Sequence, residues 1–140
     1  MDAKNSACVE TQMLIRRPAG VVFEAFINPE ITTNFWFTKS SGKLEVGKTV
    51  TWEWEMYGVS SKVLVKEIIP NQKITIEWDE PATTVEFTFD ALSENETYVV
   101  IRNYGFNLEG QALIQAIKDN TGGFTTVLDG LKAYLEHNIK

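Results

Sequence analysis

The sequence has 140 residues and a mass of 15.8 kDa, which is the size of one ordinary domain. Its composition, 44% hydrophobic and 23% charged, excludes a disordered or fibrous chain. The net charge of −6 and the pI of about 4.8 argue against binding to nucleic acid, because proteins that bind phosphate backbones carry a surplus of lysine and arginine on one face.

Membrane, disulfide and metal-binding classes are also disfavoured. No apolar run approaches the roughly 18–20 residues that cross a bilayer, and the first residues lack the apolar stretch of a signal peptide. One cysteine, Cys8, allows no internal disulfide, and one histidine, His137, allows no two-histidine metal site. We therefore expect one domain over residues 1–140, a disordered tail at residues 1–7, a cytoplasmic location and no cofactor.

The N-terminal part of the chain combines a strand with two short helices. Residues 8–15 are typical of a strand, which ends before Pro18 because a proline removes a hydrogen-bond donor from a paired strand. Pro18 also suits the first turn of a helix. Apolar residues at helical spacing predict that this helix ends at Asn28, and a second short helix is predicted over residues 29–36.

Between residues 43 and 106 the apolar residues recur at every second position. Such alternation is typical of antiparallel strands with one buried and one solvated face. The predicted strands cover residues 49–57, 61–69, 73–79, 84–91 and 97–104, and the turns between them include Gly58, Asn71 and Pro81. The pattern leaves the facing of 61–69 open. The side chains expected to face inward from the other strands are Val50, Trp52, Trp54, Met56, Ile74, Ile76, Trp78, Val85, Phe87, Phe89, Val99, Ile101 and Asn103.

After residue 106 the helical period returns. It predicts a short helix around Leu113 to Ile117 and a longer helix from Phe124 onward. Gly122 and Gly123 lie between the two, and each glycine costs a helix about 1 kcal/mol relative to alanine. The pair therefore indicates either a corner between two helices, which we favour, or a hinge that lets the last helix lift.

Four stretches carry a family likeness and follow one another in the family's order. They are Arg17–Phe26 with Asn28-Pro29-Glu30, Asn34–Phe37, Ile74–Trp78, and Gly123-Phe124 with Leu128, Leu131, Tyr134, Leu135 and Glu136. Over residues 8–137 the chain resembles the branch of the START/Bet v 1-like superfamily that is named after the Hsp90 ATPase activator homologue 1. It departs from the family pattern at Phe124, where tryptophan is usual, and at Asn103, where many members carry a histidine.

The resemblance implies an α+β architecture, the helix-grip (Bet v 1/START-like) fold. In this fold a curved antiparallel sheet of about six or seven strands wraps around a long C-terminal helix, and two short helices follow the first strand. Members usually keep an open volume under the long helix. The resemblance therefore implies a cavity for a small hydrophobic molecule, which would be lipid-like, aromatic, or similar to a polyketide or flavonoid.

The candidate site is the set of side chains expected to line this cavity. An apolar and aromatic-rich wall suits a hydrophobic small molecule, but the same side chains would also simply fill a core. Asn103 would hydrogen-bond either a ligand or the neighbouring backbone or a buried water, and Trp36 is expected at one end of the cavity or in plain packing. The candidate ligand-binding residues are Trp36, Trp52, Trp54, Met56, Trp78, Phe87, Phe89, Val99, Ile101, Asn103, Phe124 and Leu128.

Three functions remain open from the sequence. The leading hypothesis is a monomeric binding protein for a small hydrophobic molecule, with no nucleic-acid partner and no membrane span. The second is a polyketide cyclase-like or hydrolase-like enzyme, which would need further inward polar groups such as Tyr57 or Arg102. No arrangement of nucleophile and base stands out in the sequence, so no catalytic residue is predicted. The third, which the family name implies, is a stress-related co-chaperone that contacts an Hsp90-type ATPase.

Overall fold

The computed structural model describes residues 7–78 and 82–140. The predicted disordered tail therefore lies outside the described residues except for Ala7, and the predicted turn residue Pro81 lies outside them as well. Along the chain the elements are β1 (Cys8–Ile15), α1 (Ala19–Ile27), α2 (Pro29–Thr32), β2 (Lys39–Ser40), β3 (Thr49–Trp54), η1 (Glu55–Tyr57), β4 (Val59–Ile69), β5 (Lys73–Trp78), β6 (Thr83–Ser93), β7 (Glu96–Tyr104) and α3 (Gly110–His137).

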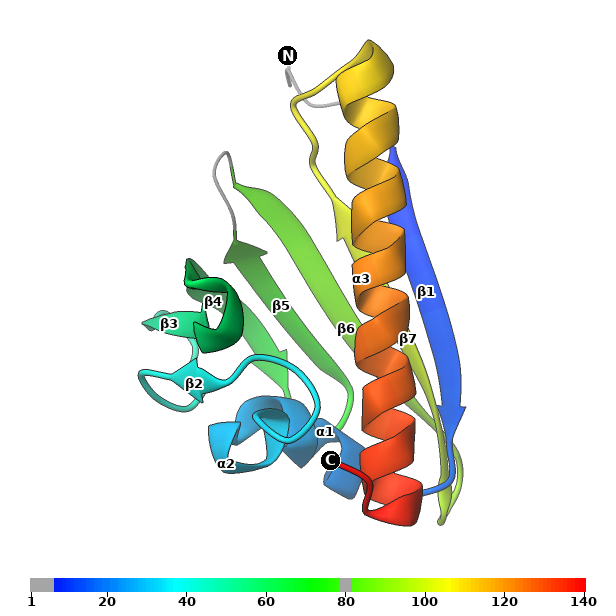
Figure 1. Ribbon diagram of the computed structural model, residues 1–140. Coiled ribbons are helices and arrows are strands. Elements are labelled where there is room, and N and C mark those ends of the chain that lie inside the picture. The colour runs from blue at the N-terminus through cyan, green and yellow to red at the C-terminus, as the bar shows by residue number, and fades with distance from the viewer. Residues whose placement is uncertain (1–6, 79–81) are drawn as a thin grey trace.

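One antiparallel sheet and one long helix dominate the described chain (Figure 1). The sheet has seven strands in the order β1-β7-β6-β5-β4-β3-β2. Helix α3 stands across one face of the sheet and packs most extensively along β1, while α1 and α2 lie near its C-terminal end. This arrangement confirms the helix-grip fold, because a single sheet with one solvated face must cover its other face with helices.

Local chemistry explains where the first elements begin and end. Pro18 precedes α1 in an extended conformation, at the predicted position. Asn28 ends α1 and begins α2, since its side-chain oxygen accepts a hydrogen bond from the backbone N–H of Glu30 at 3.1 Å. Asn71 turns the chain between β4 and β5 at a φ of +63°, a left-handed conformation that asparagine tolerates better than most residues.

Buried and exposed side chains alternate along the strands as predicted. Phe87, Val99 and Ile101 are at most 1% exposed and face the helix side of the sheet. In β4, whose facing the sequence leaves open, Val63 and Val65 are the fully buried positions. The inward faces of the central strands therefore form one continuous apolar surface.

Met56 departs from the predicted strand pattern. β3 ends at Trp54, and residues Glu55–Tyr57 turn into the 3-10 helix η1, which Gly58 closes at a φ of +62°. Met56 consequently lies at the surface and is 63% exposed. A period of two predicts facing only while the chain stays extended, and the strand stops two residues before Met56.

Helix α3 also differs from the sequence expectation, because it runs unbroken for 28 residues through Gly122 and Gly123. The favoured corner between two helices was wrong. The side chains of Thr121 and Thr125 donate hydrogen bonds to carbonyl oxygens one turn earlier, at 2.6 and 2.7 Å, as they do in a regular helix. Burial of the apolar stripe that begins at Phe124 outweighs the propensity cost of the two glycines.

Candidate functional site

Aromatic side chains fill most of the space expected to be a cavity. Phe26 from α1 packs against Phe87 with ring centroids 5.1 Å apart, and Phe37 stacks on Trp52 at 4.5 Å. The predicted lining residue Phe89 contacts the same cluster and is 4% exposed. The helix α1 and the segment that follows α2 thus supply rings that occupy the wide part of the interior.

The predicted residues Trp52, Val99, Ile101 and Leu128 are part of this core. Each is at most 2% exposed. Trp54 is partly buried and packs edge-on against Phe37 at 6.3 Å. For these residues the structure supplies protein partners, which is the alternative role that the sequence left open.

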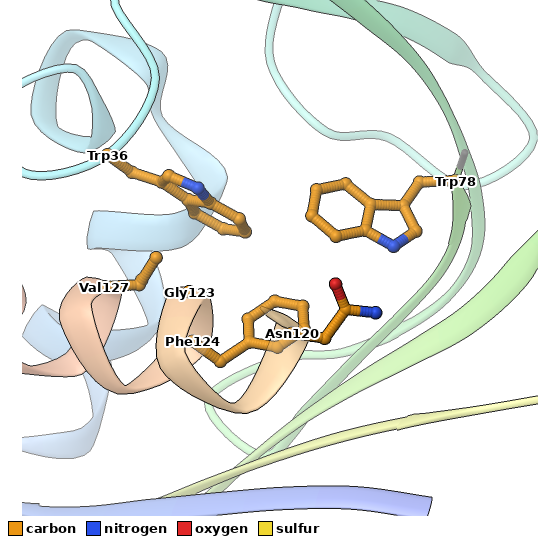
Figure 2. A pocket seen from close by; sticks show the side chains of 6 residues that line it. All are labelled: Trp36, Trp78, Asn120, Gly123, Phe124 and Val127. Carbon is orange, nitrogen blue, oxygen red and sulfur yellow. The ribbon is translucent and has the colours of Figure 1, made fainter. Parts of the chain in front are cut away.

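A recess of about 80 Å³ remains between α3 and the sheet (Figure 2). It brings together three of the predicted aromatic residues, Trp36, Trp78 and Phe124. A cavity of ~150 Å³ holds one benzene ring, so the recess has room for a few ligand atoms or water molecules and not for a large molecule. The residues that line it are Trp36, Trp78, Asn120, Gly123, Phe124 and Val127.

Trp36 lines both this recess and a wider outer groove. Its ring lies 6.0 Å from that of Trp78 and 6.2 Å from that of Phe124. The groove has a volume of about 490 Å³ and runs between α3, η1 and the segment after α2. Met56, predicted inside the cavity, lines this outer groove instead. The groove residues are Thr33, Asn34, Phe35, Trp36, Thr38, Met56, Thr126, Asp129, Gly130, Ala133, Ile139 and Lys140.

Asn103 is buried as predicted, and the protein itself occupies its hydrogen-bonding groups. Its Nδ2 donates to Thr83 Oγ1 and to the carbonyl oxygen of Thr84, each at 3.0 Å. Its Oδ1 accepts a hydrogen bond from Asn120 Nδ2 at 2.9 Å. Asn103 therefore holds Asn120 in place and makes no contact with the recess of its own.

Asn120, the polar side chain of the recess that belongs to α3, is not among the residues predicted from the sequence. A signal was present, because Asn120, Phe124 and Val127 are spaced i, i+4 and i+7 and so share one helix face. Interpreting Gly122-Gly123 as a corner hid this continuity, since it assigned Asn120 and Phe124 to different helices.

Trp78 contributes a second polar group to the recess. Its Nε1 is buried and has no hydrogen-bond partner among the described residues. Figure 2 shows this nitrogen turned toward the side-chain amide of Asn120. The recess thus combines apolar rings with the unpaired indole N–H of Trp78 and the amide of Asn120, and none of its six lining residues is charged.

The side chains named for the enzyme hypothesis lie elsewhere. Tyr57 is 76% exposed in η1, and Arg102 is exposed on the outer face of the sheet, where its Nε is 2.8 Å from Glu10 Oε1. Desolvation and then the negative charge of Glu10 raise the pKa of Cys8, which keeps its thiol protonated and poorly nucleophilic at neutral pH. Neither Tyr57 nor Arg102 lines the recess, which removes most of the support for the enzyme hypothesis.

Within residues 7–78 and 82–140, no three His, Cys, Asp or Glu side chains are placed to hold a metal ion. Over the same ranges, no helix combines the length and the apolar character needed to span a bilayer.

The sheet, the long helix across it and the recess between them define a helix-grip protein. Within that class, a family model described as activator of Hsp90 ATPase homolog 1-like protein matches residues 16–136. The chain belongs to this family, as the four sequence stretches predict. No curated protein matches the sequence.

Solved structures of bacterial proteins share the fold. Protein SSP2350 from Staphylococcus saprophyticus has 29% identity and a TM-score of 0.84, over 96% of this chain and 95% of that one. The Aha1 protein from Colwellia psychrerythraea, solved as a dimer, has 18% identity and a TM-score of 0.79, over 94% and 97%. DynU16, from the dynemicin biosynthetic locus, has 16% identity and a TM-score of 0.85, over 96% of this chain and 49% of that one.

Proposed function

We propose that the protein binds a small aromatic or otherwise hydrophobic molecule, part of which enters the recess between α3 and the sheet. The observation that carries this proposal is the recess itself, in which Trp36, Trp78 and Phe124 surround a space of about 80 Å³. Sites for small molecules are concave and mostly apolar, with a few placed polar groups, and this composition matches. The volume restricts the ligand to a small molecule or to one end of a longer one.

Gly123 supports an entry route along the helix. It is exposed and lines the recess, and a Cβ added to it would meet no atom within 4 Å. Its backbone is helical, so neither close packing nor an unusual φ requires a glycine there. A larger side chain at this position would instead extend toward the recess. The glycine thus leaves the side of the recess next to the helix open.

Titration with a panel of flavonoids, fatty acids and polyketide-like compounds, followed by amide NMR, tests the proposal. We expect shifts at Trp36, Gly123 and Phe124, because these residues line the recess. Shifts confined to surface loops, or no shifts with any compound, would overturn the proposed function.

Two matched variants sharpen this test. Gly123→Leu should weaken binding strongly, since the new side chain would occupy the recess. Gly122→Leu makes the same change at the preceding helical position, which is exposed and is not part of the recess lining. It should bind as the wild type does. Equal loss in both variants would indicate that helix mobility, and not the space beside Gly123, controls binding.

Contact with an Hsp90-type chaperone is a second proposal, which rests on the family and on one surface feature. Met56, Tyr57 and Val59 are 63%, 76% and 52% exposed and adjoin one another around η1. Exposed apolar groups of this kind suit a protein partner. Co-purification with the chaperone and a change in its ATPase rate test the contact, and the absence of both would contradict it.

We also propose that the protein works in the cytoplasm as a monomer and without a cofactor. The single cysteine of the sequence supports a reducing compartment, because it allows no internal disulfide. Sedimentation at several concentrations tests the monomer, and a constant dimer mass would contradict it.

A further inference from the structure

We infer that the ligand carries a hydroxyl group that bridges Trp78 Nε1 and Asn120 Oδ1 in the recess. This inference rests on the proposed function and specifies the chemistry of its ligand. It depends on which atom of the Asn120 amide faces the recess, on the unpaired indole N–H of Trp78, and on the uncharged side chains of the six described lining residues.

The hydrogen bonds of Asn103 determine how the Asn120 amide is oriented. The carbonyl oxygen of Thr84 can only accept, so the atom of Asn103 that lies 3.0 Å from it must be the amide nitrogen. Asn103 Oδ1 is therefore the atom that faces Asn120, and Asn120 presents its own nitrogen to it at 2.9 Å. This leaves Asn120 Oδ1 for the recess, as Figure 2 shows.

Trp78 provides the complementary donor. Its Nε1–H is buried and unpaired in the described part of the chain, and a buried donor without an acceptor is destabilising. Most buried polar groups in proteins have a partner, so an unpaired one beside a recess marks a position where an acceptor atom fits. The recess consequently offers one donor and one acceptor between apolar rings.

A hydroxyl oxygen satisfies both groups at once, since it accepts one hydrogen bond and donates another. A carbonyl or ether oxygen would accept a hydrogen bond from Trp78 and leave Asn120 Oδ1 without a hydrogen-bond donor. A carboxylate would bring a negative charge next to that oxygen, and none of the six described lining residues is a lysine or arginine that would balance it. A water molecule can bridge the same two atoms, and a ligand hydroxyl would displace it while reproducing its hydrogen bonds.

Phenol and toluene are suitable probes because they have nearly the same shape and differ in the hydroxyl, and either can place that end in the recess of about 80 Å³ while the rest of its ring stays outside. We expect phenol to bind the wild-type protein about tenfold more tightly, since a factor of ten corresponds to about 1.4 kcal/mol, a typical gain from one or two buried hydrogen bonds. In ¹H–¹⁵N spectra the indole signal of Trp78 should move on adding phenol and stay nearly unchanged with toluene.

Two variants assign and test this signal. Trp78→Phe removes the indole N–H but keeps an aromatic ring, so the preference for phenol should fall to about one. Trp54→Phe is the matched control, because Trp54 is outside the recess lining, and it should keep the tenfold preference. The wild-type indole spectra decide the question by themselves if Trp78→Phe does not fold.

The outcomes separate this inference from the proposed function. Equal affinity for phenol and toluene, with recess amides shifting and the Trp78 indole signal unmoved, would overturn the hydroxyl and leave the binding role. A preference for phenol that survives in Trp78→Phe would overturn it as well. The absence of any shift at recess residues with either probe, and with the larger panel, would overturn the binding role itself.

Discussion

Replacing Gly122 or Gly123 with alanine should stabilise the protein. Both are interior positions of α3, and a Cβ built on either meets no atom within 4 Å. Alanine is favoured over glycine inside a helix by about 1 kcal/mol, because glycine loses more backbone entropy on folding. Each substitution should therefore raise the free energy of unfolding by about 1 kcal/mol, and the melting temperature by roughly 3–4 °C for a chain of this size.

Gly130 lies in the same helix and serves as a control, because its replacement by alanine should change the free energy of unfolding in the opposite direction. A Cβ on Gly130 would lie 3.0 Å from the backbone oxygen of Phe35 and 3.3 Å from its Cβ. Backbone atoms cannot move aside without displacing the segment that carries Trp36. Overpacking of this kind costs about 1–3 kcal/mol, which exceeds the gain in helix propensity, so Gly130→Ala should lower the free energy of unfolding by about 1 kcal/mol.

Urea unfolding followed by circular dichroism at neutral pH measures all three variants. Loss of stability in Gly122→Ala or Gly123→Ala would refute the reasoning, because it would mean that the glycines are needed for a bend or a hinge. A gain in Gly130→Ala as large as in the other two would contradict the close approach of α3 to Phe35.

Further predictions concern the end of α3, the buried amide and Trp36. The side chain of Glu136 is 6% exposed and accepts hydrogen bonds from the backbone N–H of Arg16 at 2.8 Å and from Lys132 Nζ at 2.7 Å. Glu136→Gln should therefore lower the free energy of unfolding by about 1–2 kcal/mol, and an unchanged midpoint of urea unfolding would contradict this. Burial alone would raise the pKa of Glu136, but these hydrogen bonds and the charges of Lys132 and Arg16 lower it below its ordinary value. The stabilisation by ionised Glu136 is therefore complete above its ordinary pKa and is lost as the pH falls through the lowered pKa. The difference in free energy of unfolding between wild type and Glu136→Gln should thus disappear in acid, and a difference that persists there would refute this role of Glu136. Asn103→Leu should cost about 2–3 kcal/mol, because it leaves Asn120 and the Thr84 carbonyl unpaired, and a neutral result in thermal unfolding would count against the network. Trp36→Ala should join the recess to the outer groove and cost about 3 kcal/mol, and Trp36→Phe should cost less; calorimetry with naphthalene-sized probes should show new binding to the alanine variant alone.

The sequence predicted the buried faces of the strands best, because these follow from the regular spacing of apolar residues. Strands buried on one face need apolar side chains at every second position, so Phe87, Val99 and Ile101 were assigned to the inner face without knowledge of their partners. The family likeness placed these strands in a helix-grip fold, which the structure confirms. Asn103 was likewise placed inside correctly, although its partners could not be foreseen, because Thr83 and Asn120 reach it through the tertiary fold.

Element ends were less predictable. Met56 continues the alternation of β3 in the sequence, but the chain turns before it, and pattern alone carries no information on where pairing stops. In the sequence Gly122 and Gly123 resemble a helix break, because the low helix propensity of glycine can be read from the residues themselves. The burial that compensates for this cost comes from packing of the following turns of α3 against the sheet, which the sequence does not show.

The order of residues thus determined which side chains are inside, because hydrophobic burial depends on the spacing of apolar groups along each element. Only the tertiary structure decided how much room they leave. That room depends on how rings from α1, the segment after α2 and the sheet interlock, and close packing responds to fractions of an ångström that no pattern of residue types records. A recess of about 80 Å³ beside Asn120 and Trp78, in place of a wide cavity, is the result of that interlocking.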